Sequence, residues 1–335
     1  MKKETLLKLS LVVLGLGFGL VISEIALGYL FKAPRGTSFN SLEDVRRAML
    51  EPSSVDSEKN ESQPSLNALV QPHPDDRLIY DLKPHLDLTF MRVNVQTNSC
   101  GMRDPNRPLL KRSGTYRIGL LGDSFAFGWG VEWQQTFGHI LEERLNARAS
   151  NGRRFEVLNF GVPGYSTFQQ VALYKERAGD FDLDEILVFM VDNDFGLPFY
   201  VRDIENPGGM LSAVSFVRLT EQALNPDLEK QKLELSGWGP NRALAELADL
   251  AAKSGTRLNV TINPNQRWKQ TKQGLWVLRD RTDLRHIKLR RDFLEVVERN
   301  KIDPKELSLS FDPHPSPLKH RILGELLAPY FFDVL

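Results

Sequence analysis

The stretch Arg117–Phe125 (RIGLLGDSF) indicates the fold of this chain of 335 residues. It begins with a short, mostly apolar run and passes at once into Gly122, Asp123 and Ser124. A short apolar run that ends in a turn is typical of a buried β-strand. Runs of the same kind recur downstream at 155–159 (FEVLN), 185–190 (EILVFM) and 257–262 (RLNVTI).

Helical patterns lie between these strands, at 137–147 and at 241–253. Buried strands that alternate with helices predict an α/β fold with a parallel sheet covered on both faces. We therefore expect one α/β domain over 116–335. Shorter strand-like runs, separated by Pro and Asn, predict a small β-rich segment before it, over 72–115.

The N-terminal part of the chain predicts a membrane anchor. Three lysines mark 1–8, and the following 9–31 is apolar or small apart from Glu24. At about 1.5 Å per residue a helix over 9–31 is roughly 34 Å long, enough to cross a bilayer, and the preceding lysines predict that the N-terminus stays inside. A cleaved signal peptide and a buried helix of a soluble protein are the alternatives. The polar stretch 32–71 predicts a flexible linker.

Composition narrows the class of function. The 43 basic residues balance 43 acidic ones, whereas nucleic-acid binding normally needs a basic excess, so no nucleic-acid partner is expected. Cys100 is the only cysteine, which excludes an intrachain disulfide, and we expect it to be a packing residue. The histidines show no spacing typical of metal ligands, so neither a metal nor another cofactor is expected. We expect His320 to face outward or to cap the last helix.

Polar residues stand where the predicted strands end and before the final amphipathic helix. They are Ser124, Gly161, Gly164 and Asn193 after the first three strands, and Asp312 and His314 before the helix. In an open α/β sheet, ligands bind at the carboxyl ends of the strands. A histidine can accept a serine proton, a carboxylate can orient its ring, and a Gly N–H and an Asn amide can stabilise an oxyanion. Together these residues are the parts of an acyl-transfer site.

Four motifs in this order resemble the conserved blocks of the SGNH (GDSL-type) hydrolases: GDSF (122–125), VPGYS (162–166), DND (192–194) and DPHPS (312–316). The resemblance implies a flavodoxin-like three-layer α/β/α sandwich. It makes Ser124 the nucleophile, His314 the general base and Asp312 the partner of the base. The oxyanion donors that it implies are the backbone of Ser124, Gly164 and Asn193.

Two further features bear on that resemblance. The family often spaces its acid and base as D-x-x-H, whereas only Pro313 separates Asp312 from His314. The stretch NSCGMRDP (98–105), which follows an N-terminal apolar segment, is similar to exported bacterial members. It implies a single-pass protein of the bacterial inner membrane, with its catalytic domain facing the periplasm or the cell exterior.

Several residues near these motifs allow a structural or a functional interpretation. Asp123, Asp192 and Asp194 are expected to brace turns. The segment 264–291 holds nine Lys or Arg residues against two Asp. We expect either a solvated insert or a substrate-facing loop that stacks sugars and attracts an anionic partner. Its aromatic residues, and one aromatic residue after the nucleophile, are possible substrate-facing residues: Trp268, Trp276 and Trp129.

The function expected from the sequence is that of a membrane-tethered serine esterase without a cofactor. Its substrate would be an O-acyl group, such as acetyl, on a cell-envelope glycan, or an acylated lipid. An O-acyltransferase that uses the same site for a surface polysaccharide is one alternative, because both reactions share an acyl-enzyme on Ser124. A non-catalytic glycan-binding protein with a degenerate site is the other.

Overall fold

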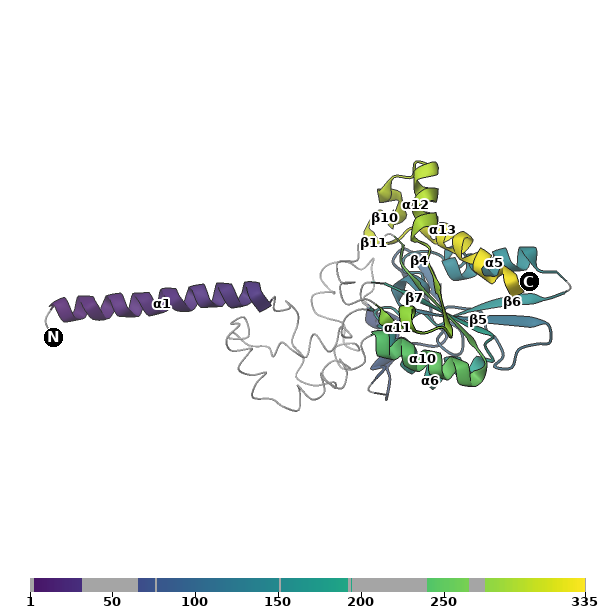
Figure 1. Ribbon diagram of the computed structural model, residues 1–335, viewed down its shortest axis with the longest axis horizontal. Helices are drawn as coiled ribbons and strands as arrows, with labels where there is room; N and C mark the ends of the chain where they lie inside the picture. Colours follow the sequence, from purple (N-terminus) through teal and green to yellow (C-terminus); the bar gives the residue numbers. More distant parts are fainter. Residues whose placement is uncertain are drawn as a thin grey trace. The chain divides into compact units, whose positions relative to one another are not determined.

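The computed structural model describes residues 3–31, 66–75, 77–150, 152–191, 194, 240–264 and 275–334. The chain divides into two compact units. The described part of the first unit is the helix α1 (Lys3–Phe31), and every other described element belongs to the second (Figure 1).

Helix α1 contains the stretch that the sequence predicts as a membrane anchor, 9–31. Among the described helices, however, none is both long and apolar enough to span a membrane. The helix is therefore present, while its membrane-spanning character is not supported. The predicted linker, 32–71, lies outside the described residues up to position 65.

Five parallel strands form the central sheet in the order β6-β5-β7-β8-β9. This is the strand order 2-1-3-4-5 of flavodoxin-like folds. The four strands predicted from the sequence are all present, and β7 is buried along its whole length, as expected for a strand covered on both faces. The bounds are β5 (Thr115–Gly122), β6 (Arg154–Asn159), β7 (Glu185–Met190), β8 (Arg257–Ile262) and β9 (Leu284–Ile287).

Strand β9 corrects the prediction that 264–291 is an insert. The described part of that segment forms α11 (Trp276–Asp280), β9 and the start of α12 (Arg290–Arg299). Arg285 of β9 donates to Asn259 Oδ1 (2.6 Å) and to the buried carboxylate of Glu185 (3.2 Å). A buried carboxylate needs such partners, so Arg285 is a structural residue of the sheet.

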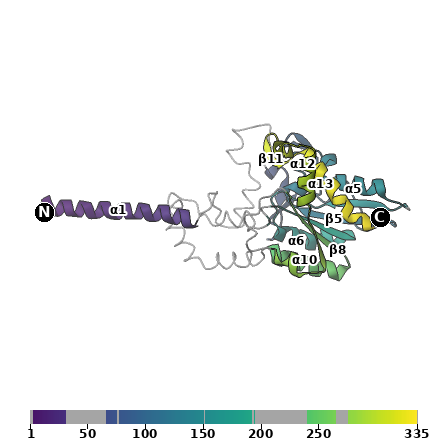
Figure 2. The ribbon, with the colours of Figure 1, turned by 45° about the horizontal axis from the view of Figure 1, so that its top comes forward.

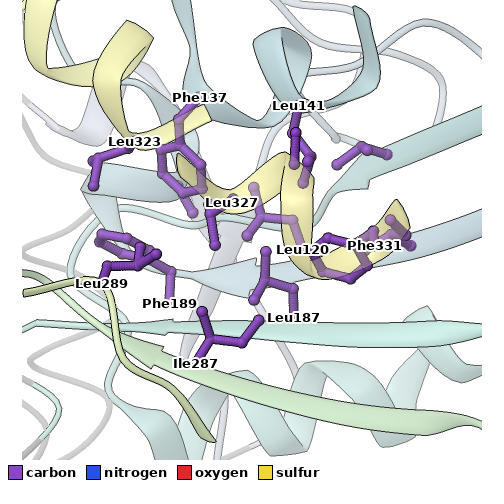
Figure 3. Close-up of a cluster of buried hydrophobic side chains, with 14 of the residues drawn as sticks. Leu120, Phe137, Leu141, Leu187, Phe189, Ile287, Leu289, Leu323, Leu327 and Phe331 are labelled. Atoms are coloured by element: carbon purple, nitrogen blue, oxygen red, sulfur yellow. The ribbon is translucent and has the colours of Figure 1, made fainter. Parts of the chain in front are cut away.

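Helices cover both faces of the sheet. Helices α5 (Phe137–Arg148) and α13 (Pro317–Leu327) lie side by side on one face, and α6 (Thr167–Glu176) and α10 (Pro240–Ser254) on the other (Figures 1 and 2). The first face carries a large apolar core. It joins Leu120 and Leu187 of the sheet to side chains of α5 and α13, among them Phe137, Leu141, Leu323 and Leu327 (Figure 3).

Two short antiparallel hairpins precede the sheet. Strand β1 (Val70–Pro72) pairs with β2 (Tyr80–Leu82), and β3 (Asp87–Phe90) pairs with β4 (Val93–Gln96). The hydroxyl of Tyr80 donates to Pro163 O (2.7 Å), and the hydroxyl of Tyr165 donates to Tyr80 O. These two bonds attach the first hairpin to the loop that carries the VPGYS motif.

The remaining elements are short and join the larger ones. They are η1 (Leu66–Ala68), α4 (Ser124–Phe127), η2 (Trp133–Gln135), η3 (Ala178–Phe181), η6 (Pro304–Leu307), β10 (Ser308–Leu309), β11 (Asp312–Pro315) and η7 (Ala328–Val334).

His320 of α13 is fully buried, so the prediction that it faces outward or caps the helix is wrong. Its Nδ1 accepts a hydrogen bond from the Phe137 backbone N–H (3.2 Å), and its ring stacks on the Phe137 ring. The imidazole therefore joins α13 to the first turn of α5. Burial lowers the pKa of His320 to about 3, and the nearby charges of Lys319 and Arg103 act in the same direction.

Because His320 is buried with a lowered pKa, we expect the free energy of unfolding to decrease in acid. The unfolded chain binds a proton at His320 near pH 6.5 while the folded chain does not, so stability falls as the pH drops from about 6.5 towards 3, by at most about 1.4 kcal/mol per pH unit. In His320→Asn, the amide oxygen replaces Nδ1 as acceptor and nothing titrates. Urea unfolding at pH 7 and pH 5 should show a smaller acid loss in the variant.

His85→Asn is the matched control, because His85 is exposed and has a φ of 57°, which Asn tolerates. An acid loss in His320→Asn equal to that of wild type would contradict the assignment.

Candidate active site

The nucleophile motif occupies the turn between β5 and the single-turn helix α4. Asp123 caps this helix, since its Oδ1 accepts from the Phe125 backbone N–H (2.9 Å). Ser124 is the first residue of α4 and is 8% exposed; its hydroxyl lies 3.3 Å from Asp123 Oδ2. The side chain of Asp123 thus holds the turn, which agrees with the structural role expected for it.

Strand β11 supplies the other two residues of the site. His314 Nε2 lies 2.8 Å from Ser124 Oγ, although 190 positions separate them in the sequence. His314 Nδ1 forms a short hydrogen bond with Asp312 Oδ1, which also accepts from the His314 backbone N–H (2.9 Å). A proton on Nδ1, facing the carboxylate, leaves the lone pair of Nε2 free to accept the Ser124 hydroxyl proton.

The spacing of Asp312 and His314 is explained by their place on a strand. Side chains two residues apart in a β-strand point to the same face. Asp312 and His314 therefore lie on one face of β11, with Pro313 directed to the other. The extended strand thus allows Asp312 to bond His314 Nδ1 with one residue between them, instead of the two of a D-x-x-H spacing.

Trp129 packs against the imidazole. Its indole stacks on the His314 ring with centroids 5.0 Å apart, and the ring of Phe125 lies 5.7 Å away. Phe90 of β3 contacts the indole edge-on at 4.7 Å. The indole thus limits rotation of the imidazole, a positioning role that its place in the sequence did not indicate.

Arg103 fixes the loop that follows the nucleophile helix. Its guanidinium is 1% exposed and donates to Phe127 O, Gly128 O, Val131 O and, on β4, Asn94 O. Four carbonyls on two segments are therefore held by one side chain. Burial lowers the pKa of Arg103 to about 10, so the group stays charged at neutral pH.

Sequence reasoning missed Arg103, although it lies in the stretch 98–105 that drew attention by resemblance. Within that stretch, Asn98 Oδ1 accepts from the backbone N–H groups of Cys100 (2.9 Å) and Met102 (3.0 Å), which shapes the turn before Arg103. The side chain of Cys100 is exposed. The prediction that it is a packing residue is wrong, because the turn needs only its backbone.

The two glycines of the second motif have different structural reasons. A Cβ on Gly161 would come within 2.4 Å of Phe127 N, so the loop approaches α4 too closely for a side chain. Gly164 has a φ of +83°, which favours glycine. Its N–H donates to no other described residue, so that group is available to a ligand. Gly164 is half-buried, and its turn is closed by a hydrogen bond from Tyr165 N to Val162 O (3.1 Å).

The third motif is described only in part. Asn193 and Asp192 lie outside the described residues. Asp194 is fully buried and accepts from Thr167 Oγ1 (2.8 Å), Gln170 Nε2 (2.9 Å) and Val191 N (2.7 Å). Burial raises the pKa of Asp194 to about 8, to which the nearby Asp123 also contributes. Its bonds join the end of β7 to the start of α6.

Two of the predicted substrate-facing residues belong to the segment 264–291. Trp268 lies outside the described residues, and Trp276 begins α11 with 41% of its surface exposed. Within the described residues, the rings paired with His314 are those of Phe125 and Trp129. Among the described residues, no group of three or more His, Cys, Asp or Glu residues is arranged to hold a metal ion.

Comparison with known proteins gives structural likeness only. No family model and no curated protein matches the chain. Similar solved structures include the lipase/acylhydrolase from Enterococcus faecalis, with 15% identity over 66% of this chain and 97% of that chain and a TM-score of 0.41. Another is a catalytic mutant of the acetylxylan esterase Axe2 from Geobacillus stearothermophilus, with 14% identity over 65% and 94% and a TM-score of 0.41.

A third similar structure is the psychrotrophic esterase EstA from Pseudoalteromonas sp., with 12% identity over 65% of this chain and 97% of that chain and a TM-score of 0.41. The four ordered motifs resemble those of SGNH hydrolases in sequence. Because the identities to the solved structures are low, the chemistry of the site follows from its own residues.

The role of Arg103 is tested by Arg103→Lys. A lysine keeps the charge but cannot match the guanidinium fork, so buried carbonyls lose partners, and we expect about 1–3 kcal/mol lower stability together with a lower kcat. Urea unfolding and ester hydrolysis measure the two effects. Arg144→Lys is the control, since Arg144 is 53% exposed and bonds only at the surface, to Glu325. An unfolding free energy of Arg103→Lys within about 0.5 kcal/mol of wild type would show that the guanidinium does not hold the loop after α4.

Trp129 is tested by a pair of variants. Trp129→Ala removes the ring that covers the imidazole and should lower kcat by about 10- to 100-fold, because small displacements of a catalytic group are costly. Trp129→Phe keeps an aromatic face and should retain most of the activity. Equal kcat values in both variants, measured on a p-nitrophenyl ester, would show that the stacked ring does not position His314.

Proposed function

We propose that this chain is a serine esterase of the SGNH type that works through an acyl-enzyme. The observation that carries the proposal is the 2.8 Å separation of Ser124 Oγ and His314 Nε2, with Asp312 bonded to Nδ1 of the same ring. A hydroxyl, a base within hydrogen-bond reach and a group that orients the base form the arrangement of an activated nucleophile. Side chains of His314 and Asp312 that are 22% and 17% exposed leave the site open to a substrate.

The reaction proceeds in two halves. In the first, Ser124 Oγ attacks the ester carbonyl while His314 Nε2 takes the hydroxyl proton, and the Asp312 carboxylate stabilises the imidazolium. The tetrahedral intermediate collapses, the C–O bond to the alcohol breaks, and Nε2 returns the proton to the leaving alkoxide. In the second half, water loses a proton to Nε2 and attacks the acyl carbonyl. The C–O bond to Ser124 then breaks, Nε2 returns the proton to Ser124 Oγ, and the acid leaves.

The negative charge of each intermediate needs hydrogen-bond donors. We assign this role to the backbone N–H groups of Ser124 and Gly164 and to the side-chain amide of Asn193. The free N–H of Gly164, on a turn that only glycine favours, supports its part in this set. The assignment of Asn193 rests on its place in the sequence.

The proposed substrate is an O-acyl group, such as acetyl, on a glycan. The triad itself accepts any ester whose carbonyl reaches Ser124, so the class of substrate depends on groups around it. From the N-terminal sequence we further propose that the enzyme acts in the cell envelope. A non-catalytic glycan-binding protein is disfavoured, because a degenerate site has no reason to retain Ser124, His314 and Asp312 in bonding contact.

Removal of the nucleophile or the base tests the proposal. Ser124→Ala and His314→Ala should each lower kcat on p-nitrophenyl acetate by on the order of 10³-fold or more. A fluorophosphonate probe should label wild type and fail to label Ser124→Ala. Ser150→Ala is the control, since Ser150 is exposed and lies at the end of α5, outside the site. Undiminished hydrolysis or labelling in Ser124→Ala would overturn the proposal.

A further inference from the structure

A cavity of about 500 Å³ lies beside the loop that follows the nucleophile helix. Its walls are the strand β4, the segment 97–106 and the single turn η2 with its preceding residue Glu132. The side chains that give the cavity its chemistry are Asn94, Gln96, Asn106, Glu132, Trp133 and Gln134. The proposed esterase mechanism uses none of them.

Amide side chains dominate this lining. Asn94 and Gln96 are exposed and two residues apart on β4, so they point to the same side of the strand. Asn106 uses its Oδ1 to accept from the backbone and hydroxyl of Ser99, which directs its amide group. An amide offers two donors and an acceptor. Rows of such groups match neighbouring hydroxyls, which also donate and accept.

An indole stands among these amides. Trp133 is half-buried, and its ring contacts the His139 imidazole with centroids 4.1 Å apart, which holds it in place. Specific small-molecule sites combine an aromatic surface with a few directed polar groups. A sugar ring presents both partners: C–H groups for the indole and hydroxyls for the amides.

The charge of the lining limits the ligand. None of the described residues that line the cavity is Lys or Arg. The charged groups facing it are Glu132 and the buried Asp104, which lies 3.5 Å from Arg107 Nε behind the wall. Burial raises the pKa of Asp104 to about 7. A phosphate or a uronic acid in the cavity would lie near the carboxyl groups of the lining, whose described residues include no Lys or Arg to balance its negative charge. The lining therefore fits a neutral ligand.

The cavity is joined to the catalytic residues through one rigid segment. Arg103 bonds both Asn94 O on β4 and Val131 O before η2, which holds the two walls together. Trp129, whose ring stacks on His314, precedes Glu132 by three residues, so their Cα atoms are at most about 11 Å apart. An oligosaccharide bound in the cavity is therefore within a few sugar units of Ser124.

We propose that this cavity is a carbohydrate subsite: it binds the unmodified sugar units of a neutral glycan and thereby presents an O-acyl group on the same chain to Ser124. The proposal rests on the esterase function proposed above and adds the place where the glycan binds and the neutral charge of its sugar units. It also separates glycan binding from the basic segment 264–291, whose described arginines include Arg285 and Arg281, both engaged with acidic side chains.

Binding is tested first without catalysis. The full-length Ser124→Ala chain is titrated by calorimetry with cellopentaose, xylopentaose and mannopentaose, and with pentagalacturonate as the anionic comparison. Saturable binding of at least one neutral pentaose, at least 10-fold tighter than that of pentagalacturonate, is expected. No binding of any neutral pentaose, or preferred binding of pentagalacturonate, overturns the proposal.

Variants then locate the bound sugar. Trp133→Ala and Gln96→Ala, each added to Ser124→Ala, should weaken binding at least 10-fold. Because Gln96 is exposed, its substitution leaves the fold intact, so a loss of binding in that variant reports on the cavity. Asn300→Ala is the matched amide control, because Asn300 is exposed at the end of α12. Binding that survives both cavity variants but is lost in Trp276→Ala overturns the proposal in favour of the basic segment.

Kinetics separate this inference from the function on which it rests. With Ser124 intact, two substrates are compared: the acetylated form of the pentaose that binds, and p-nitrophenyl acetate. Trp133→Ala should raise the KM for the acetylated pentaose, and this fold-change should be at least 10 times the fold-change in kcat/KM for p-nitrophenyl acetate. If both esters are hydrolysed and the KM for the acetylated pentaose is unchanged, the proposed carbohydrate subsite is wrong, while the proposed esterase function is retained. If wild type hydrolyses neither ester, the esterase fails, and the binding titrations alone decide whether the cavity takes sugars.

Discussion

The hydrogen bond between Ser124 and His314 requires two segments 190 positions apart to end at the same place. Strand β5, an inner strand of the sheet between β6 and β7, ends at Gly122, just before Ser124, while β11 is held by the helix that follows it. That helix cannot slide along α5 without leaving the Phe137 N–H and the His320 imidazole unpaired in the core. The accuracy of the site is therefore set by the packing of α13 against α5, where a large apolar cluster also lies.

The site is supported from the other side by the chain that precedes the sheet. Arg103 holds the carbonyls after α4, and Phe90 packs against the indole that covers His314. The Tyr80 hydroxyl donates to Pro163 O and the Tyr165 hydroxyl donates to Tyr80 O, and these two bonds join the first hairpin to the glycine turn. Buried donors and acceptors of this kind have little freedom, because an unpaired partner in the core costs free energy. The three motifs that the structure describes in full, GDSF, VPGYS and DPHPS, are thus fixed by neighbours outside those motifs.

Much of the sheet and the three residues brought together in the site are accessible to sequence reasoning, because local patterns encode them. Apolar runs gave four strands close to their observed bounds, and the residues after them pointed to one edge of the sheet. Strand β9 was missed because a charged residue such as Arg285 is typical of a solvated segment. In the structure Arg285 instead pairs with the buried Glu185 of the sheet. His320 and Cys100 were placed wrongly, since the burial of a single residue depends on partners distant in sequence. The same holds for Arg103, since three of its four acceptors lie 24 to 28 residues away.

The hairpin contacts have a consequence for what counts as the smallest functional part of this protein. If the glycine turn, the loop after Ser124 and the wall of the polar cavity are all braced by residues 66–107, then the parallel sheet with its helices does not hold the site by itself. Shortening the chain to its α/β core would expose Tyr165 and leave the carbonyls around Gly128 without their guanidinium. Transfer of this α/β core to another protein would accordingly have to carry the leading hairpins along with it.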